Sequence, residues 1–149
     1  MIPPASPNET TLVLRRTFAA SRTRVFRAWI TPKALESWLR PRGMSMTVRS
    51  LDARVGGSFC FELENGSSIV GTYLEIVPPE KLVFAWTVGA ALGQETVVTL
   101  DFLERGAVTE LILTHEHLGT PERHAVAEGG WSYVFDALAS VLSSPHLDW

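Results

Sequence analysis

The sequence predicts an α+β domain in which a curved antiparallel sheet of six or seven strands is covered by one long C-terminal helix. Three observations support this fold class. Between residues 44 and 117 apolar and polar residues mostly alternate, which is the pattern of half-buried strands. From residue 121 to 142 the apolar residues recur every three or four positions, as they do on one face of a helix. A first strand and two short helical segments precede both regions.

The first expected strand covers residues 11–19, TLVLRRTFA, in which apolar and β-branched residues predominate. Ser21 can then cap a helix whose apolar residues lie at helical spacing. Thr31 and Pro32 indicate the start of a second helix, because threonine can cap a helix and proline suits its first position. The Pro-Arg-Gly at residues 41–43 is expected to end that second helix.

Turn signals divide the following region into strands joined by hairpins. Gly56-Gly57, Asn65-Gly66 and Arg105-Gly106 are expected turns, and Pro78-Pro79 closes a strand. The strands between these signals are expected at residues 44–49, 59–64, 68–77, 81–88, 96–104 and 107–116. The last helix, residues 121–142, follows Thr120, which is a suitable cap.

This arrangement predicts an internal cavity. A strongly curved sheet must cover its concave face, and the helix at residues 121–142 is the only long amphipathic element available to do so. One helix cannot fill the whole concavity of such a sheet. The space left beneath it would be lined by tryptophan, phenylalanine and methionine side chains, which is typical of a pocket for an apolar ligand.

Length and composition favour a single soluble globular domain. The chain has 149 residues, of which 46% are hydrophobic and 19% are charged. We expect a flexible N-terminal arm at residues 1–10, one domain at residues 11–142 and a C-terminal tail at residues 143–149. The sequence shows no secretory signal and no apolar run of the roughly 20 residues that a membrane helix needs, and Cys60 is its single cysteine. A cytoplasmic protein with no membrane partner is therefore expected.

Basic residues are concentrated in the first third of the chain. Residues 1–54 carry ten lysines and arginines against three acids, a balance of +7, and the remainder carries three bases against thirteen acids, a balance of −10. A basic half is found in proteins that bind nucleic acids or acidic partners. No interleaving of aromatic and basic residues accompanies the charge. We therefore favour early and late segments that neutralise each other, and expect no nucleic-acid partner.

The segment THEHLGT, residues 114–120, is the strongest apparent signal for chemistry. On a strand, His115 and His117 would share a face with their α-carbons roughly 7 Å apart, a spacing that can chelate zinc if a third ligand is present. Glu116 would point to the opposite face, and His124 could reach the pair only if the loop folds tightly. We therefore expect histidines at the strand end or pocket rim and no metal. An acid–base role for His115 toward a bound phenol or ketone stays open.

Other residues carry weaker signals. Trp38, Trp86 and Trp131 could either stack on a flat ligand or simply fill the core beneath the helix. Gly129-Gly130 lies inside the last helix, where each glycine costs about 1 kcal/mol relative to alanine, and this indicates a late start, a kink or a close approach of another segment. Cys60 has no histidine close in sequence, so a nucleophilic role is not expected.

Four blocks of sequence resemble a known domain family. They are FRAWITPKALESWLRP (26–41), LDARVGGSFCFEL (51–63), GTYLEIVPPEKLVFAWT (71–87) and GGWSYVFDALASVL (129–142). The family is named after the activator of the heat-shock protein 90 ATPase, and it belongs to the START-like (SRPBCC), helix-grip superfamily of the birch-pollen allergen. The likeness runs from about Leu12 to Leu142.

The resemblance implies a helix-grip fold, in which a seven-stranded antiparallel sheet grips the C-terminal helix. It also implies close packing at Gly130 and Trp131, which match the Gly-Trp pair of the family. Members of the superfamily bind hydrophobic molecules, act as polyketide cyclases or aromatase-like enzymes, sequester toxic natural products or stimulate a chaperone. The eukaryotic chaperone activators carry an additional N-terminal domain, and about ten residues precede the first expected strand here, so chaperone activation is not the favoured role.

We therefore expect a non-catalytic module that binds or sequesters a hydrophobic or aromatic small molecule, without a cofactor, metal or catalytic residue. One alternative is an enzyme of the cyclase or dehydratase kind that uses the same cavity. Another is a chaperone- or regulator-binding protein that uses the basic face of Arg22, Arg24 and Arg27, and a homodimer is also left open. The residues expected to line the pocket are Trp38, Met44, Phe61, Tyr73, Phe84, Trp86, Leu100, Leu113, His115, Trp131, Phe135 and Leu138.

Overall fold

The structure is a computed structural model, and it describes residues 10–89 and 95–143. Apart from Thr10 and Ser143, the arm expected at residues 1–10 and the tail expected at residues 143–149 lie outside the described residues. Within the described part of the chain, none of the helices is both long enough and apolar enough to cross a membrane.

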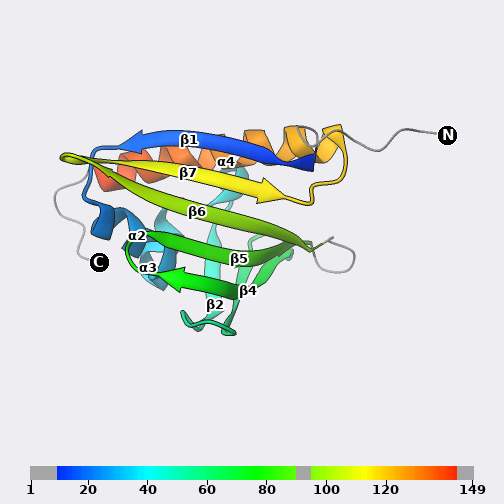
Figure 1. Ribbon diagram of the computed structural model, residues 1–149. Helices are drawn as coiled ribbons and strands as arrows, with labels where there is room; N and C mark the ends of the chain where they lie inside the picture. Colours follow the sequence, from blue (N-terminus) through cyan, green and yellow to red (C-terminus); the bar gives the residue numbers. More distant parts are fainter. Residues whose placement is uncertain (1–9, 90–94, 144–149) are drawn as a thin grey trace.

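Seven strands form one antiparallel sheet in the order β1-β7-β6-β5-β4-β3-β2 (Figure 1). Strands β2 to β7 follow one another as hairpins, so each lies beside its neighbour in sequence. Strand β1 instead pairs with β7, where Leu12 lies opposite His115 and Phe18 opposite Thr109. The sheet confirms the predicted fold class, and its strands are β1 (Leu12–Phe18), β2 (Met46–Leu51), β3 (Ser58–Leu63), β4 (Ser68–Val77), β5 (Lys81–Val88), β6 (Thr96–Arg105) and β7 (Val108–Glu116).

The helices are α2 (Arg22–Ile30), α3 (Pro32–Trp38), the short 3-10 turn η1 (Pro41–Gly43) and α4 (Pro121–Leu142). The Ser21 hydroxyl accepts a hydrogen bond from the Arg24 backbone N–H at 3.3 Å, so Ser21 caps α2 as predicted. Thr31 precedes α3 without a side-chain cap. The residues expected to end the second helix form η1 instead, because α3 has already ended at Trp38.

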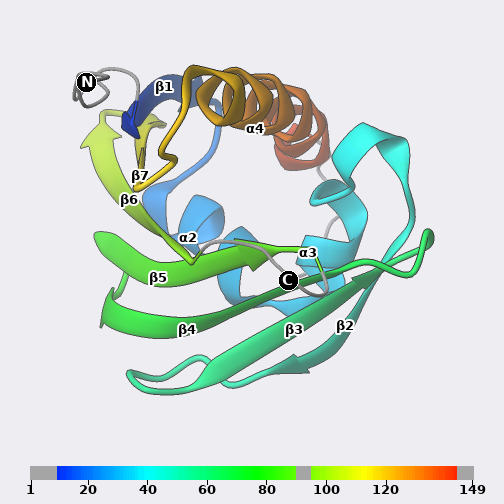
Figure 2. The same cartoon turned by 90° about the vertical axis from the view of Figure 1, so that its right-hand side faces the viewer.

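Figure 2 shows the sheet curling from β1, which lies beside α4, round to β2, with α4 and the pair α2–α3 on its concave side. Alternate strand residues face this side, and those on β6 and β7 form the centre of the core. In the core α2 packs on β6, where the Phe26 and Phe102 rings meet edge to face with their centroids 5.2 Å apart. Helices α2 and α3 meet through Trp29 and Trp38, at 4.6 Å.

All the buried residues of helix α4 lie in its C-terminal half. Trp131, Val134, Phe135, Leu138 and Leu142 are buried, whereas every residue from 121 to 130 is exposed or half-buried. The continuous apolar face predicted for this helix therefore meets the core from Trp131 onward. Among the described residues, no other element fills the space beneath the first half of the helix.

Gly129 and Gly130 lie where α4 leaves the core. Of the Gly130-Trp131 pair at which close packing is expected, Trp131 is buried, but Gly130 is not closely packed. A Cβ atom built on either glycine meets no heavy atom of the described residues within 4 Å. The close approach occurs instead at Gly71 on β4, where a Cβ would collide with the Ala85 carbonyl oxygen and the Phe59 ring. The helical glycines border open space and thus remove side chains from the inner wall of α4.

Replacing Gly129 or Gly130 with alanine is expected to raise the free energy of unfolding by up to about 1 kcal/mol each, because alanine favours the helix and its methyl group meets no neighbour. The matched control is Gly71→Ala, which we expect to destabilise the sheet because the added atom collides with backbone. Urea unfolding followed by circular dichroism measures both. A loss of stability in the helical variants would contradict the open space beside α4.

Early basic residues and later acidic residues pair across the fold. Arg16 lies 2.9 Å from Asp136 of α4, and Arg49 lies 2.8 Å from Glu62 of β3. Arg15 and Arg22 approach Glu110 and Glu80 more loosely, at 3.8 and 3.9 Å. These ion pairs support the expected neutralisation of the two halves, although exposed pairs contribute at most about 1 kcal/mol each.

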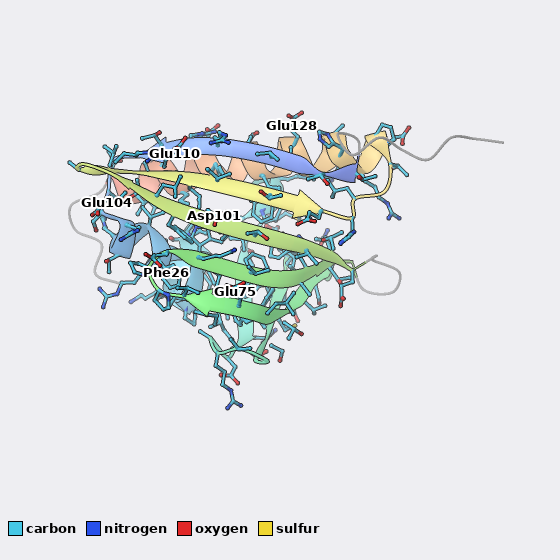
Figure 3. All side chains as sticks on the ribbon, in the orientation of Figure 1. Phe26, Glu75, Asp101, Glu104, Glu110 and Glu128 are labelled. Carbon is cyan, nitrogen blue, oxygen red and sulfur yellow. The ribbon has the colours of Figure 1, made fainter. Side chains whose placement is uncertain are left out.

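The outer face of the sheet, which is turned away from α4, carries several of the later acids. Glu75, Asp101 and Glu110 lie on this face (Figure 3). The strand alternation places their neighbours Leu100, Phe102 and Leu111 in the core. These three acids thus lie on the side of the sheet that is turned away from α4.

Candidate functional site

A pocket of about 1120 Å³ lies beneath the first half of α4. Its other walls come from η1, the β3–β4 hairpin, the end of β5 and the start of β6. The volume is at or slightly above the range of about 300–1,000 Å³ that is usual for small-molecule sites. The pocket therefore occupies the space that the predicted fold leaves beneath its helix.

Most of the inner wall is apolar. The rings of Trp86 and Trp131 pack against each other in this wall, with centroids 5.1 Å apart, and both residues are almost fully buried. Aliphatic side chains complete this wall, namely Leu39, Leu63, Ile69 and Leu118. Aromatic rings beside aliphatic groups provide a surface on which a flat apolar molecule can pack.

Two polar residues, Thr96 and His115, are buried in the same wall, and a chain of three hydrogen bonds joins them to the tryptophans. The Trp131 indole N–H donates to His115 Nδ1 at 3.0 Å. His115 Nε2 lies 2.7 Å from Thr96 Oγ1, and the Thr96 hydroxyl donates to the Trp86 backbone carbonyl at 2.7 Å. The chain ties α4 to β7, β6 and β5.

The partners assign the tautomer of His115. An indole N–H can only donate, so Nδ1 accepts and carries no proton. A carbonyl oxygen can only accept, so Thr96 donates to Trp86 and its oxygen accepts the proton of His115 Nε2. Both ring nitrogens are then engaged while the imidazole is neutral. Consistent with this, burial lowers the pKa of His115 from 6.5 to about 4.

This bonding leaves His115 with no free lone pair for a metal ion or for a substrate proton. A metal would have to displace the Trp131 bond, and among the described residues no group of three or more histidine, cysteine, aspartate or glutamate side chains could hold one. The arrangement is that of a structural hydrogen-bonded histidine whose ring edge lies in the pocket wall.

The other histidines of the THEHLGT region do not join His115. Strand β7 ends at Glu116, and His117 adopts a left-handed backbone with φ of 68° and is exposed. The expectation that His115 and His117 share a strand face is therefore wrong, because the strand ends between them. His124 is half-buried in the first turns of α4.

Four of the twelve residues expected to line the pocket lie on its wall, namely Met44, Trp86, His115 and Trp131. The structure places the other eight in the packed core rather than on the pocket wall, and they are Trp38, Phe61, Tyr73, Phe84, Leu100, Leu113, Phe135 and Leu138. The reason is that α2 and α3 enter the concavity and fill one end of it. Inward-facing strand residues at that end meet these helices and not the pocket.

Several residues at the pocket mouth are not among those predicted from the sequence. Arg42 and Tyr133 line the pocket from η1 and α4, and Leu118 closes it from the loop before α4. Leu118 is buried even though it follows the end of β7. The glycine pair inside an amphipathic helix was the one available signal, since it marked the place where α4 has no close neighbour.

A family model matches most of the chain. The model describes the activator of Hsp90 ATPase homolog 1-like proteins, and it matches residues 19–143. The human activator of 90 kDa heat shock protein ATPase homolog 1 is 23% identical over 128 residues, which cover 85% of this chain but only 35% of the human protein. The chain thus spans about a third of the length of that relative.

Solved structures share the fold. The crystal structure of protein CV1439 from Chromobacterium violaceum is 29% identical, with a TM-score of 0.81 over 91% of this chain and 98% of that one. A solution structure of a protein from Arthrobacter aurescens has a TM-score of 0.82 at 20% identity, over 95% of this chain and 91% of that one. With the family model covering most of the sequence, the chain belongs to the family of activator of Hsp90 ATPase homolog 1-like proteins.

Proposed function

We propose that this domain binds a hydrophobic or aromatic small molecule in the pocket beneath α4, without catalysis. The observation that carries the proposal is a pocket of about 1120 Å³ whose buried polar groups already bond to one another. Such a wall gains little from a polar ligand, since each buried polar atom of that ligand would lose its water without a replacement partner. An apolar ligand gains the full benefit of burial, at about 25 cal/mol per Å².

The same bonding argues against the enzyme alternative. A cyclase or dehydratase needs a general acid or base within hydrogen-bond reach of its substrate. His115 is the titratable side chain at the buried end of the pocket, and both of its nitrogens are engaged. Using it as a base would break the Trp131 bond and leave an indole N–H without a partner, which costs about 1–3 kcal/mol.

A protein partner is the second candidate, because the human relative is named as an activator of a heat-shock protein ATPase. The basic face of α2 supports it weakly. Arg22 lies 3.9 Å from Glu80, and Arg24 donates to the Leu142 carbonyl at 2.7 Å, so two of its three arginines have contacts within the chain. We therefore favour small-molecule binding in the pocket over protein binding by the basic face of α2.

Binding can be tested with 1-pyrenebutanol, a neutral flat probe that receives excitation energy from tryptophan. Because Trp86 and Trp131 line the pocket, we expect saturable energy transfer to the probe as it is titrated. Gly130→Leu should weaken binding at least tenfold, since its side chain enters open pocket space.

The matched control for this variant is Glu128→Leu, which adds the same side chain at an exposed position of α4 outside the pocket wall. It should bind like the wild type. Absence of saturable transfer in the wild type, or equal loss in both variants, would count against the pocket as the binding site.

A further inference from the structure

We propose that the pocket selects hydrophobic molecules that carry one anionic group, and that Arg42 binds this group at the pocket mouth. The inference rests on the proposed function and names the class of ligand. It combines two features of the same wall. The side-chain donors of Thr96, His115 and Trp131 at its buried end are all engaged, and an arginine at the rim has no hydrogen-bond or ion-pair partner among the described residues.

The buried end cannot hold the charged or polar part of a ligand. His115 uses both ring nitrogens, and the Trp131 N–H is engaged by it. The Thr96 hydroxyl has already donated its proton to the Trp86 carbonyl. A ligand group placed here finds no donor available to it. A carboxylate would be desolvated without compensation, which is strongly unfavourable.

Arg42 offers the opposite environment. It is exposed, it lines the pocket, and it forms no hydrogen bond or ion pair with any other described residue. Arginines elsewhere on the surface do have carboxylate partners, including Arg49 with Glu62 and Arg54 with Asp52. A guanidinium with its donors free is suited to bidentate binding of a carboxylate or a similar anion.

The backbone holds Arg42 at the mouth. Its φ of 55° and ψ of 23° lie in the left-handed region, which is uncommon for residues other than glycine. The turn is closed by hydrogen bonds from Gly43 N to the Arg40 carbonyl and from Met44 N to the Pro41 carbonyl. Gly43 also lies against Tyr133 of α4, since its Cβ would be 3.1 Å from the phenol oxygen. The position of this arginine is therefore fixed by the packing of η1 on the helix.

The remaining polar groups of the mouth favour an anion. Asn65 Oδ1 accepts from both the backbone N–H and the hydroxyl of Ser67, so the side chain has only its amide protons left to offer. Arg123 is a second base on the wall, and Glu122 is the acid beside it. A cationic ligand would instead pair with Glu122. The test must therefore distinguish anionic from cationic ligands.

The test compares three pyrene probes that differ only in the end group, namely 1-pyrenebutyrate, 1-pyrenebutanol and 1-pyrenebutylamine. The wild type should bind the butyrate about fivefold more tightly than the alcohol, as expected for one charge pair at a partly exposed site. Arg42→Gln should abolish this preference and leave the affinity for the alcohol unchanged. Arg42→Lys should retain only part of it, because the ammonium keeps the charge but not the bidentate geometry, and added salt should reduce it.

Arg27→Gln, at an exposed position of α2 outside the pocket wall, is the matched loss of charge and should keep the full preference. Thermal unfolding of each variant checks that the fold is retained. Three outcomes would overturn the inference and leave the proposed function standing. They are equal binding of butyrate and alcohol by the wild type, a preference of the wild type for the amine, and a preference for the butyrate that survives Arg42→Gln. If none of the three probes bound, both would be overturned.

Discussion

Replacing Trp131 with alanine is expected to lower the free energy of unfolding by about 3–5 kcal/mol. Trp131 is only 5% exposed, and its ring lies among those of Trp86, Trp29 and Phe135, with centroid distances of 5.1, 5.9 and 6.1 Å. Alanine would remove these contacts and also the donor to His115. Because Trp131 is the first buried residue of α4, the loss falls at the point where the helix leaves the core.

The control for this variant is Trp131→Phe, which keeps an aromatic ring but has no N–H. His115 Nδ1 would then lose its partner while the aromatic packing largely remained. We expect a cost of about 1–3 kcal/mol, the penalty of an unsatisfied buried acceptor. Denaturant unfolding followed by far-ultraviolet circular dichroism measures both variants without relying on tryptophan fluorescence. If Trp131→Ala cost less than Trp131→Phe, the described packing of α4 would be incorrect.

Lowering the pH from 7 to 4 is expected to remove about 3 kcal/mol of stability through His115 alone. The folded protein holds the pKa of this histidine near 4, below its ordinary value of 6.5, because the ring is buried. Between these two values the unfolded chain takes up a proton that the folded protein does not. Stability is therefore level above pH 6.5, falls by about 1.4 kcal/mol per pH unit down to pH 4, and levels off below.

His115→Gln isolates this effect from the titration of the carboxylates. A glutamine amide can accept from Trp131 through its oxygen and donate to Thr96 through its nitrogen, yet it does not titrate. The difference in stability between wild type and variant should therefore change by about 3 kcal/mol from pH 7 to pH 4. Parallel pH profiles for the two proteins would show that His115 is not held neutral by its surroundings.

The positions of most helices and strands could be predicted from the spacing of apolar residues and from helix-capping and turn residues. Alternation located the six hairpin strands, and Ser21 and Pro32 marked the starts of α2 and α3 as predicted. The differences lie at chain reversals. Residues 41–43 form η1 instead of a helix end, and β7 stops before His117. Both segments contain residues with positive φ, which a pattern of polar and apolar residues does not reveal.

The sequence predicted an apolar pocket beneath the last helix, but only some of the residues that line it. Inward-facing positions were identified correctly as buried, including Leu100, Leu113 and Phe84. The sequence could not show which of these positions line the pocket and which lie in the packed core, because this depends on how far α2 and α3 reach into the concavity. Arg42 could not be found at all, since its place at the mouth depends on the packing of η1 against Tyr133.

By itself, the sequence determined which elements form, which side of each strand is buried, and that one helix must cover a curved sheet, because periodicity and turn chemistry act between residues close in the chain. Only the tertiary structure decided that β1 pairs with β7, that α2 and α3 fill one end of the concavity, and that His115 lies between Trp131 and Thr96. These contacts join segments far apart in sequence. Their geometry is set by packing around a shared core. This packing makes His115, a histidine of the apparent metal motif, a hydrogen-bonded part of an apolar wall.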